Sequence, residues 1–233
     1  MLMSTGGPLD KSQTTHLALE GGFDLVGVLP AGVARGPDWV QSVLVLAYAT
    51  LDEAYDYNVY VALPEGRRWS KFAYEVVIAR AAVLALALRD SGARAEPLLF
   101  EDSAAVINLR QAAVAAGLGV LGKNELVVTE RFGPRVRLSA VFTDLALAPD
   151  QPQREYYCSS CTRCWAACPT GALGPQGLDR SRCLAEFQPA PEMLARQKRE
   201  TRQLTPYTRL QCRACVDACP IGARLAEPWW DGE

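Results

Sequence analysis

The sequence predicts an α+β fold in two parts: an amino-terminal sheet domain covered by helices, residues 1–150, and a smaller cysteine-rich domain, residues 151–233. Strand-like and helix-like segments alternate through the first part, as they do where helices cover a sheet. All eight cysteines lie in the last third of the chain. Prolines and mixed polar residues interrupt the apolar pattern over 145–155, which places the boundary at about residue 150.

The elements of the first part follow from periodicity and stop signals. Two segments have helical periodicity, 69–92, which ends at a glycine, and 106–117. Short apolar runs predict strands at 24–28, 42–49, 95–100, 125–128 and 135–147.

One segment between the second strand and the first helix, 52–69, has little periodicity and carries four large aromatic residues: Tyr55, Tyr57, Tyr60 and Trp69. We expect a surface loop that covers its own apolar patch. The alternative is a lid, because long loops in compact domains are often functional and flat rings pack against a large flat ligand.

The charge balance and the termini limit the partners. The chain has 24 Lys plus Arg against 26 Asp plus Glu, a net charge of −2, so no general basic field attracts it to nucleic acid or anionic lipid. The amino terminus lacks the pattern of a signal peptide. The apolar stretch 81–88 is far shorter than the ~20 residues of a membrane span. We therefore expect a soluble cytoplasmic protein with no membrane partner, whose cysteines bind metal and do not form disulfides.

The spacing of the cysteines carries the chemistry. Residues 158–169 read C-x2-C-x2-C-x3-C-P, the run that binds [4Fe–4S] clusters in bacterial ferredoxins, where the fourth cysteine binds the other cluster. A second copy is present, since CTRCWAACPTGA at 161–172 matches CRACVDACPIGA at 212–223 with every Cys, Pro and Gly in register. The first cysteine of this copy is displaced upstream, to Cys183.

Exchange of the fourth ligands uses all eight cysteines and predicts a bacterial-ferredoxin-like domain with two [4Fe–4S] clusters. The first set is Cys158, Cys161, Cys164 and Cys219, and the second set is Cys168, Cys183, Cys212 and Cys215. Zinc is the competing ligand, but zinc ribbons need neither the third close cysteine nor the repeated x3-C-P. Pro169 and Pro220 fix the backbone beyond a ligand, and Gly171 and Gly222 permit a turn or a close approach.

Other polar residues are weaker candidates. A glycine-rich turn could let a cofactor approach the backbone, and its candidate binding residues are Gly119, Gly122, Lys123 and Asn124; the alternative is that Lys123 and Asn124 only close a helix. His16, the single histidine, is expected to be solvated. The segment 179–213 has eight basic residues against four acidic ones, which predicts a solvated face or, alternatively, a dock for an acidic electron donor or a phosphate backbone.

Several motifs together resemble the epoxyqueuosine reductase family, which is related to the iron–sulfur part of the reductive dehalogenases. They are GLGVLGKN at 117–124, RLSAVFTDLAL at 137–147, CSSCTRCWAACPTGA at 158–172, LDRSRC at 178–183 and CRACVDACP at 212–220. The resemblance implies a corrinoid (cobalamin) on the amino-terminal domain, reduced through the two clusters. It also implies deoxygenation of an epoxide in a modified tRNA base, with tRNA as a partner, and we expect a reduced ferredoxin or flavodoxin as the electron donor.

The sequence departs from the family at the expected proton donor. Aligning Arg110 and Gly117 with the family puts Ser103 where the family has an aspartate, so Asp102, one position away, becomes the catalytic candidate. The family's C-P-W-N is C-P-I-G here. Two functions remain open: an iron–sulfur oxidoreductase that passes electrons to a cofactor or substrate on the amino-terminal domain, and a non-catalytic electron-transfer protein whose amino-terminal domain docks a redox partner.

Overall fold

The computed structural model describes residues 8–64, 66–99, 105–187 and 189–225. The chain forms two compact units whose segments alternate along the sequence. The first unit consists of Met1–Ala49, Ala73–Leu121 and Arg137–Tyr156, and the second of Thr50–Phe72, Gly122–Val136 and Tyr157–Glu233. The cysteine-rich segment thus lies in one unit together with two upstream segments. The boundary near residue 150 stays a prediction for where independently folding domains would divide.

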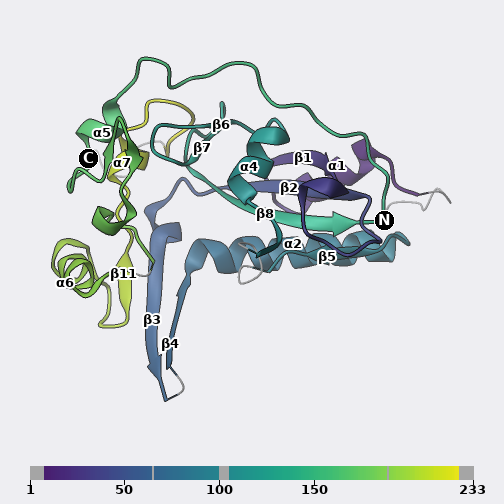
Figure 1. Ribbon diagram of the computed structural model, residues 1–233. Helices are drawn as coiled ribbons and strands as arrows, with labels where there is room; N and C mark the ends of the chain where they lie inside the picture. The colour runs from purple at the N-terminus through teal and green to yellow at the C-terminus, as the bar shows by residue number, and fades with distance from the viewer. Residues whose placement is uncertain (1–7, 65, 100–104, 188, 226–233) are drawn as a thin grey trace, which may run out of the picture. The chain divides into compact units, whose positions relative to one another are not determined.

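The first unit is built on a four-stranded sheet in the order β1-β2-β8-β5 (Figure 1). The strands are β1 (Leu25–Pro30), β2 (Ser42–Ala49), β8 (Val136–Thr143) and β5 (Ala95–Pro97). β1 pairs antiparallel with β2, and β5 pairs antiparallel with β8. All four strands fall within or beside segments predicted as strands, and together with the helices they confirm the predicted α+β class.

Helices cover both faces of this sheet. α2 (Phe72–Asp90) packs on one face together with α1 (Lys11–Glu20), and α4 (Leu109–Ala115) contacts β1 and β2. Gly27 of β1 lies on the face of the sheet that α4 covers. A Cβ built at Gly27 would lie 2.8 Å from the Cβ of Ala116, the residue that follows α4. α1 was not predicted, although Asp10 and Gln13 form a capping box at its start, a signal that is readable in the sequence.

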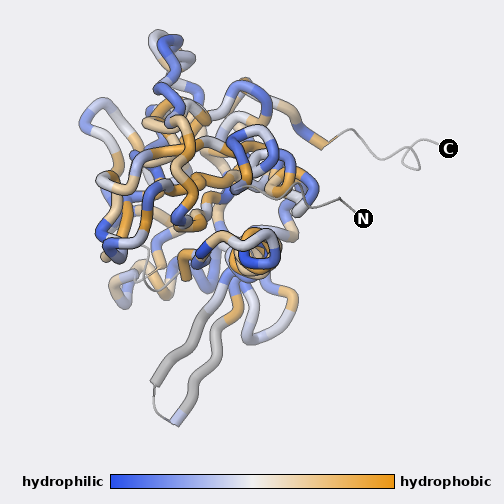
Figure 2. The backbone as a smooth tube through the Cα atoms, turned by 90° about the vertical axis from the view of Figure 1, so that its right-hand side faces the viewer, coloured by the Kyte–Doolittle hydropathy of each residue, from blue (hydrophilic) through white to orange (hydrophobic). Residues whose placement is uncertain are grey.

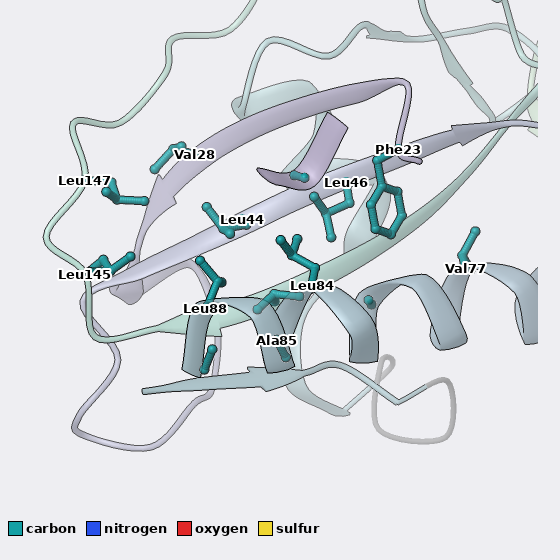
Figure 3. Packing of buried hydrophobic residues seen from close by; sticks show 14 residues of the cluster. Phe23, Val28, Leu44, Leu46, Val77, Leu84, Ala85, Leu88, Leu145 and Leu147 are labelled. Atoms are coloured by element: carbon teal, nitrogen blue, oxygen red, sulfur yellow. The ribbon is translucent and has the colours of Figure 1, made fainter. Parts of the chain in front are cut away.

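The core of the first unit lies between α2 and the sheet (Figure 3). Leu84 and Leu88 of α2 point toward Leu44 and Leu46 of β2, and all four side chains are almost fully buried. Alternate residues of β2 face opposite sides of a strand, so Val45 is buried on the other face. Figure 2 views α2 nearly end-on and shows that it carries both hydrophobic and hydrophilic residues, as expected for a helix with one buried face.

The second unit contains a three-stranded antiparallel sheet in the order β11-β3-β4. Its strands are β3 (Tyr57–Leu63), β4 (Gly66–Lys71) and β11 (Thr208–Leu210). The expectation of a loop over 52–69 was therefore wrong, since this segment begins with the short helix η2 (Glu53–Asp56) and continues as a hairpin. Pairing with β11, which is distant in sequence, stabilises a segment whose own pattern is weak.

The remaining elements are short. They are η1 (Ala31–Val33), β6 (Val120–Leu121), β7 (Val127–Val128), α5 (Arg163–Ala166), β9 (Leu173–Gly174), β10 (Gly177–Leu178), η3 (Arg180–Arg182), α6 (Pro191–Glu200) and α7 (Ala214–Asp217). None of the helices in the described part of the chain has the length and apolar content needed to cross a membrane.

Candidate metal centres

The internal repeat of the sequence is also a repeat of local structure. Each copy places one cysteine in a four-residue helix, Cys164 in α5 and Cys215 in α7, and the two helices contact each other. Each copy then turns at a glycine in the left-handed region, Gly171 with φ 61° and Gly222 with φ 83°. This confirms the role predicted for the two glycines, because side chains rarely adopt these angles.

The second of these turns also needs its glycine for close approach. A Cβ at Gly222 would lie 2.0 Å from the backbone nitrogen of Gly133 and 2.2 Å from the carbonyl carbon of Phe132. The segment that follows Cys219 therefore packs backbone against backbone on the turn before Arg135.

All eight cysteines have free thiols, and seven of them are intermediate in burial, with Cys219 buried. Most of the electrostatic interactions between the thiols fall within the two predicted sets, and one, between Cys215 and Cys164, joins the sets. Cys219 interacts with Cys158 and Cys161, and so does Cys164. Cys215 interacts with Cys212, Cys183, Cys164 and Cys168. The Cys219 thiol thus interacts with thiols of the first set, about sixty residues upstream, although its sequence neighbours are in the second.

Burial disfavours the charged thiolate form in both sets of cysteines, and a bound metal would supply the positive charge that stabilises it. Burial, with the neighbouring Cys212 and Cys183 thiols adding to the effect, raises the pKa of Cys215 to about 12. Burial likewise raises the pKa of Cys183 and Cys212, again with thiol neighbours adding to the effect. Iron binds the thiolate form, so metal binding offsets the cost of burying these groups together.

Backbone N–H groups point at several of the sulfur atoms. The N–H of Ala185 donates to Cys183 Sγ over 3.4 Å. Burial acts to raise the pKa of Cys168, but backbone N–H donors of Leu173, Thr170 and Ala172 and the Thr170 hydroxyl together lower it. Such donors stabilise a thiolate and help to set the reduction potential of a cluster.

The eight thiols therefore match two [4Fe–4S] clusters in number. Among the described residues, no three Cys, His, Asp or Glu side chains are close enough together to hold a single metal ion. The exact ligand assignment within each set stays a prediction.

A buried arginine lies beside the first set. Arg135 is 2% exposed and donates hydrogen bonds of 3.0 Å to three backbone carbonyls, those of Val216, Cys219 and Ile221. Burial lowers the pKa of this guanidinium, whereas the Cys219 thiol acts to raise it. No feature of the sequence singled out Arg135, because its three partners lie more than eighty residues away.

Lys123, a predicted cofactor contact, bonds to the cysteine-rich loop of the same unit. Its ammonium donates to the carbonyls of Ser159, at 3.1 Å, and Cys161, at 3.0 Å, and lies 5.1 Å from the centre of the Trp165 ring. The Trp165 indole N–H in turn donates to the Lys123 carbonyl over 3.3 Å. These contacts of Lys123 thus stabilise the loop that carries Cys161.

The other predicted contacts of the turn are also engaged. Gly119 and Gly122 are buried, and a Cβ at Gly122 would lie 2.6 Å from a methyl group of Val128. Asn124 is buried and its side-chain oxygen accepts a 3.3 Å hydrogen bond from the Leu126 N–H. Cofactor binding at these residues stays a prediction. Asp102 lies outside the described residues, as does Ser103.

A buried ion-pair network lies beside the second set. Asp56 forms ion pairs with Lys71, at 2.8 Å, and with Arg213, at 3.1 Å, and at most 9% of each of the three side chains is exposed. Lys71 also donates to Gln211. Gln211 and Arg213 flank Cys212, so the network links the β3–β4 hairpin to a cluster-ligand segment.

Most of the basic side chains in 179–213 already have partners. Acidic residues pair with Arg180, Arg196, Arg202 and Arg213. Arg182 donates to the Thr170 carbonyl. This favours the reading as a solvated face, and docking of a partner stays a prediction. His16, on α1, is 63% exposed at the side chain and lies 3.1 Å from Glu20, which agrees with the expected solvated position.

Comparison with known proteins identifies the cysteine-rich segment. Residues 157–222 match the family model described as "4Fe-4S double cluster binding domain". This segment is therefore similar to double [4Fe–4S] cluster domains. The match favours iron–sulfur clusters over zinc, and it includes all eight cysteines.

Curated relatives extend the likeness beyond this segment. The chain is 37% identical over 120 residues to the epoxyqueuosine reductase of Lactococcus garvieae, which covers 51% of this chain and 33% of the relative. It is 37% identical over 114 residues to a tetrachloroethene reductive dehalogenase of Desulfitobacterium hafniense, which covers 46% of this chain and 21% of the relative. The chain therefore spans about a third or less of the length of these two proteins.

Solved structures show the same fold over nearly the whole chain. An epoxyqueuosine reductase from Streptococcus thermophilus matches with a TM-score of 0.63 at 20% identity, covering 94% of this chain and 67% of that one. A reductive dehalogenase matches with a TM-score of 0.55 at 16% identity, covering 84% of this chain and 35% of that one. The resemblance to epoxyqueuosine reductases, and to reductive dehalogenases, is confirmed.

Proposed function

We propose that the protein is an iron–sulfur oxidoreductase that carries electrons through two [4Fe–4S] clusters to a redox centre on the first unit. The observation that carries this proposal is that eight free thiols lie in the segment that matches the double-cluster domain, with the Cys219 thiol interacting electrostatically with Cys158 and Cys161 of the first copy of the repeat. Each cluster, when bound, takes up and releases one electron. Cysteine thiolates hold the irons, and backbone N–H groups such as that of Ala185 stabilise the sulfurs.

The first prediction concerns metal content. Protein isolated without oxygen should contain about eight irons and about eight sulfides per chain, because two cubane clusters require them. Iron, acid-labile sulfide and zinc are measured on the same sample, with absorption spectra before and after reduction. Stoichiometric zinc without sulfide would end the proposal.

The redox centre that we propose for the first unit is a corrinoid. This proposal is supported by structural similarity to a reductive dehalogenase whose reaction is B12-dependent dehalogenation. The match to that structure covers 84% of this chain. Corrinoid contacts at Gly119, Gly122, Lys123 and Asn124 stay a prediction, and the Lys123 ammonium already bonds to two loop carbonyls. Lys198 and Arg199, exposed on α6, are candidates for docking a reduced ferredoxin or flavodoxin.

The second prediction is that cobalamin binds to the cluster-loaded protein. Equilibrium dialysis with cobalamin and, separately, with flavin mononucleotide should show saturable binding of cobalamin only. A Lys123→Ala variant should retain this binding, because its ammonium bonds to loop carbonyls, but should lose iron from the first set more readily. Absence of binding of either compound at high micromolar concentration would favour the alternative function, an electron carrier whose first unit docks a partner.

The substrate is tested last. One matched epoxyqueuosine reductase has been solved with an epoxyqueuosine-modified tRNA stem loop, so this stem loop is the first compound to assay. Turnover under reducing conditions would assign the tRNA epoxide reaction to this chain. Cobalamin binding without turnover of the stem loop would point to a different substrate, in agreement with the departure at Ser103.

A further inference from the structure

The charge environments of the two cysteine sets differ. Beside the second set, the buried cations Lys71 and Arg213 share the carboxylate of Asp56. Beside the first set, Arg135 donates only to backbone carbonyls and, within the described part of the chain, forms no ion pair. The positive charge near the first set is therefore not neutralised by a carboxylate in contact with it.

Arg135 keeps this charge under ordinary conditions because a guanidinium stays protonated in proteins. At 2% exposure, water screens it weakly. Its partners include the carbonyl of Cys219 itself, and its charge interacts with the Cys219 thiol. A cluster bound to four thiolates becomes more negative by one charge on reduction, so a buried cation at this place stabilises the reduced form more than the oxidised form.

We propose that Arg135 is a positioning residue for the first cluster, where it orients the Cys219 segment and raises the cluster's reduction potential. The inference rests on the proposed function, since it requires that the first set hold a cluster. Two roles are combined in one side chain. The hydrogen bonds to Val216, Cys219 and Ile221 fix the backbone around the ligand, and the charge favours uptake of an electron.

The chain offers variants that separate charge from geometry. Arg135→Gln removes the charge, and Arg135→Lys keeps it but loses the forked hydrogen bonds. Arg224 donates to the same Cys219 carbonyl but is exposed, so Arg224→Gln should act in the same direction and more weakly. Arg131, exposed four residues before Arg135, provides Arg131→Gln as a control with an equal change in charge.

The test is an anaerobic redox titration followed by electron paramagnetic resonance, with iron and sulfide measured on every sample. Signals of the first cluster are assigned in a Cys215→Ala background, which removes a ligand of the second. Arg135→Gln should make the first cluster at least tenfold harder to reduce, a shift of about 59 mV to lower potential for one electron. The second cluster should be unchanged, Arg135→Lys should stay near the wild type, and Arg131→Gln should have no effect.

The outcomes separate the inference from the function on which it rests. Lack of clusters in the wild type would refute the proposed function itself. Two clusters with an unchanged first potential in Arg135→Gln, or equal shifts in Arg135→Gln and Arg135→Lys, would overturn the role of the charge. If both Arg135 variants fail to assemble, a downward shift of the first cluster in Arg224→Gln would support the inference, and no shift would overturn it.

Discussion

A Cys219→Ala variant is expected to lose the cluster of the first set and to keep the cluster bound by its sequence neighbours, Cys212 and Cys215. The reason is that the Cys219 thiol interacts electrostatically with Cys158 and Cys161, and its carbonyl is bonded to Arg135. Iron and sulfide should both fall to about half, since one of two cubanes is lost.

Alkylation identifies which cluster is lost. A bound cluster protects its cysteines from an anaerobic alkylating reagent, so mass spectrometry of the variant should find Cys158, Cys161 and Cys164 modified. Cys215→Ala is the matched control from the same copy of the repeat, and it should expose Cys168, Cys183 and Cys212 instead. Modification of Cys212 in the Cys219→Ala protein, with Cys158 protected, would refute the crossed ligation.

The second large effect is expected from Asp56→Asn. This change leaves Lys71 and Arg213 buried without their shared carboxylate, and removing one member of a buried ion pair costs about 3–5 kcal/mol. Because Arg213 follows Cys212, the second cluster should also be lost more readily. Urea denaturation of the cluster-loaded protein, followed by circular dichroism and by cluster absorbance, measures both effects.

The matched control is Glu53→Gln, which breaks the ion pair with Arg202 in the same unit. Both of these side chains are about half exposed, so their pair contributes little to stability and the denaturation midpoint should barely move. Equal midpoints for Asp56→Asn and Glu53→Gln would contradict a structural role for the buried network.

Local signals in the sequence were sufficient for much of the fold. The strand predicted over 42–49 has these bounds in the structure, and the helix predicted over 69–92 spans Phe72–Asp90. Both are long and strongly apolar, so their own residues determine the secondary structure. The helix Lys11–Glu20 was missed because its apolar pattern is weak, although its cap was visible.

The sequence by itself was enough to predict two clusters and their cysteine ligands, because the ligands of a cubane come mostly from consecutive turns of one loop and the spacing is therefore local. Only the tertiary structure decided that 57–71 is a hairpin completed by residues 208–210, since each strand of a sheet depends on a partner that can lie anywhere in the chain. The tertiary structure also brought Arg135 to the carbonyl of Cys219, and it placed Asp56 between the Lys71 and Arg213 cations. Burial and long-range pairing give these side chains their energetic weight, and neither is encoded in the residues next to them.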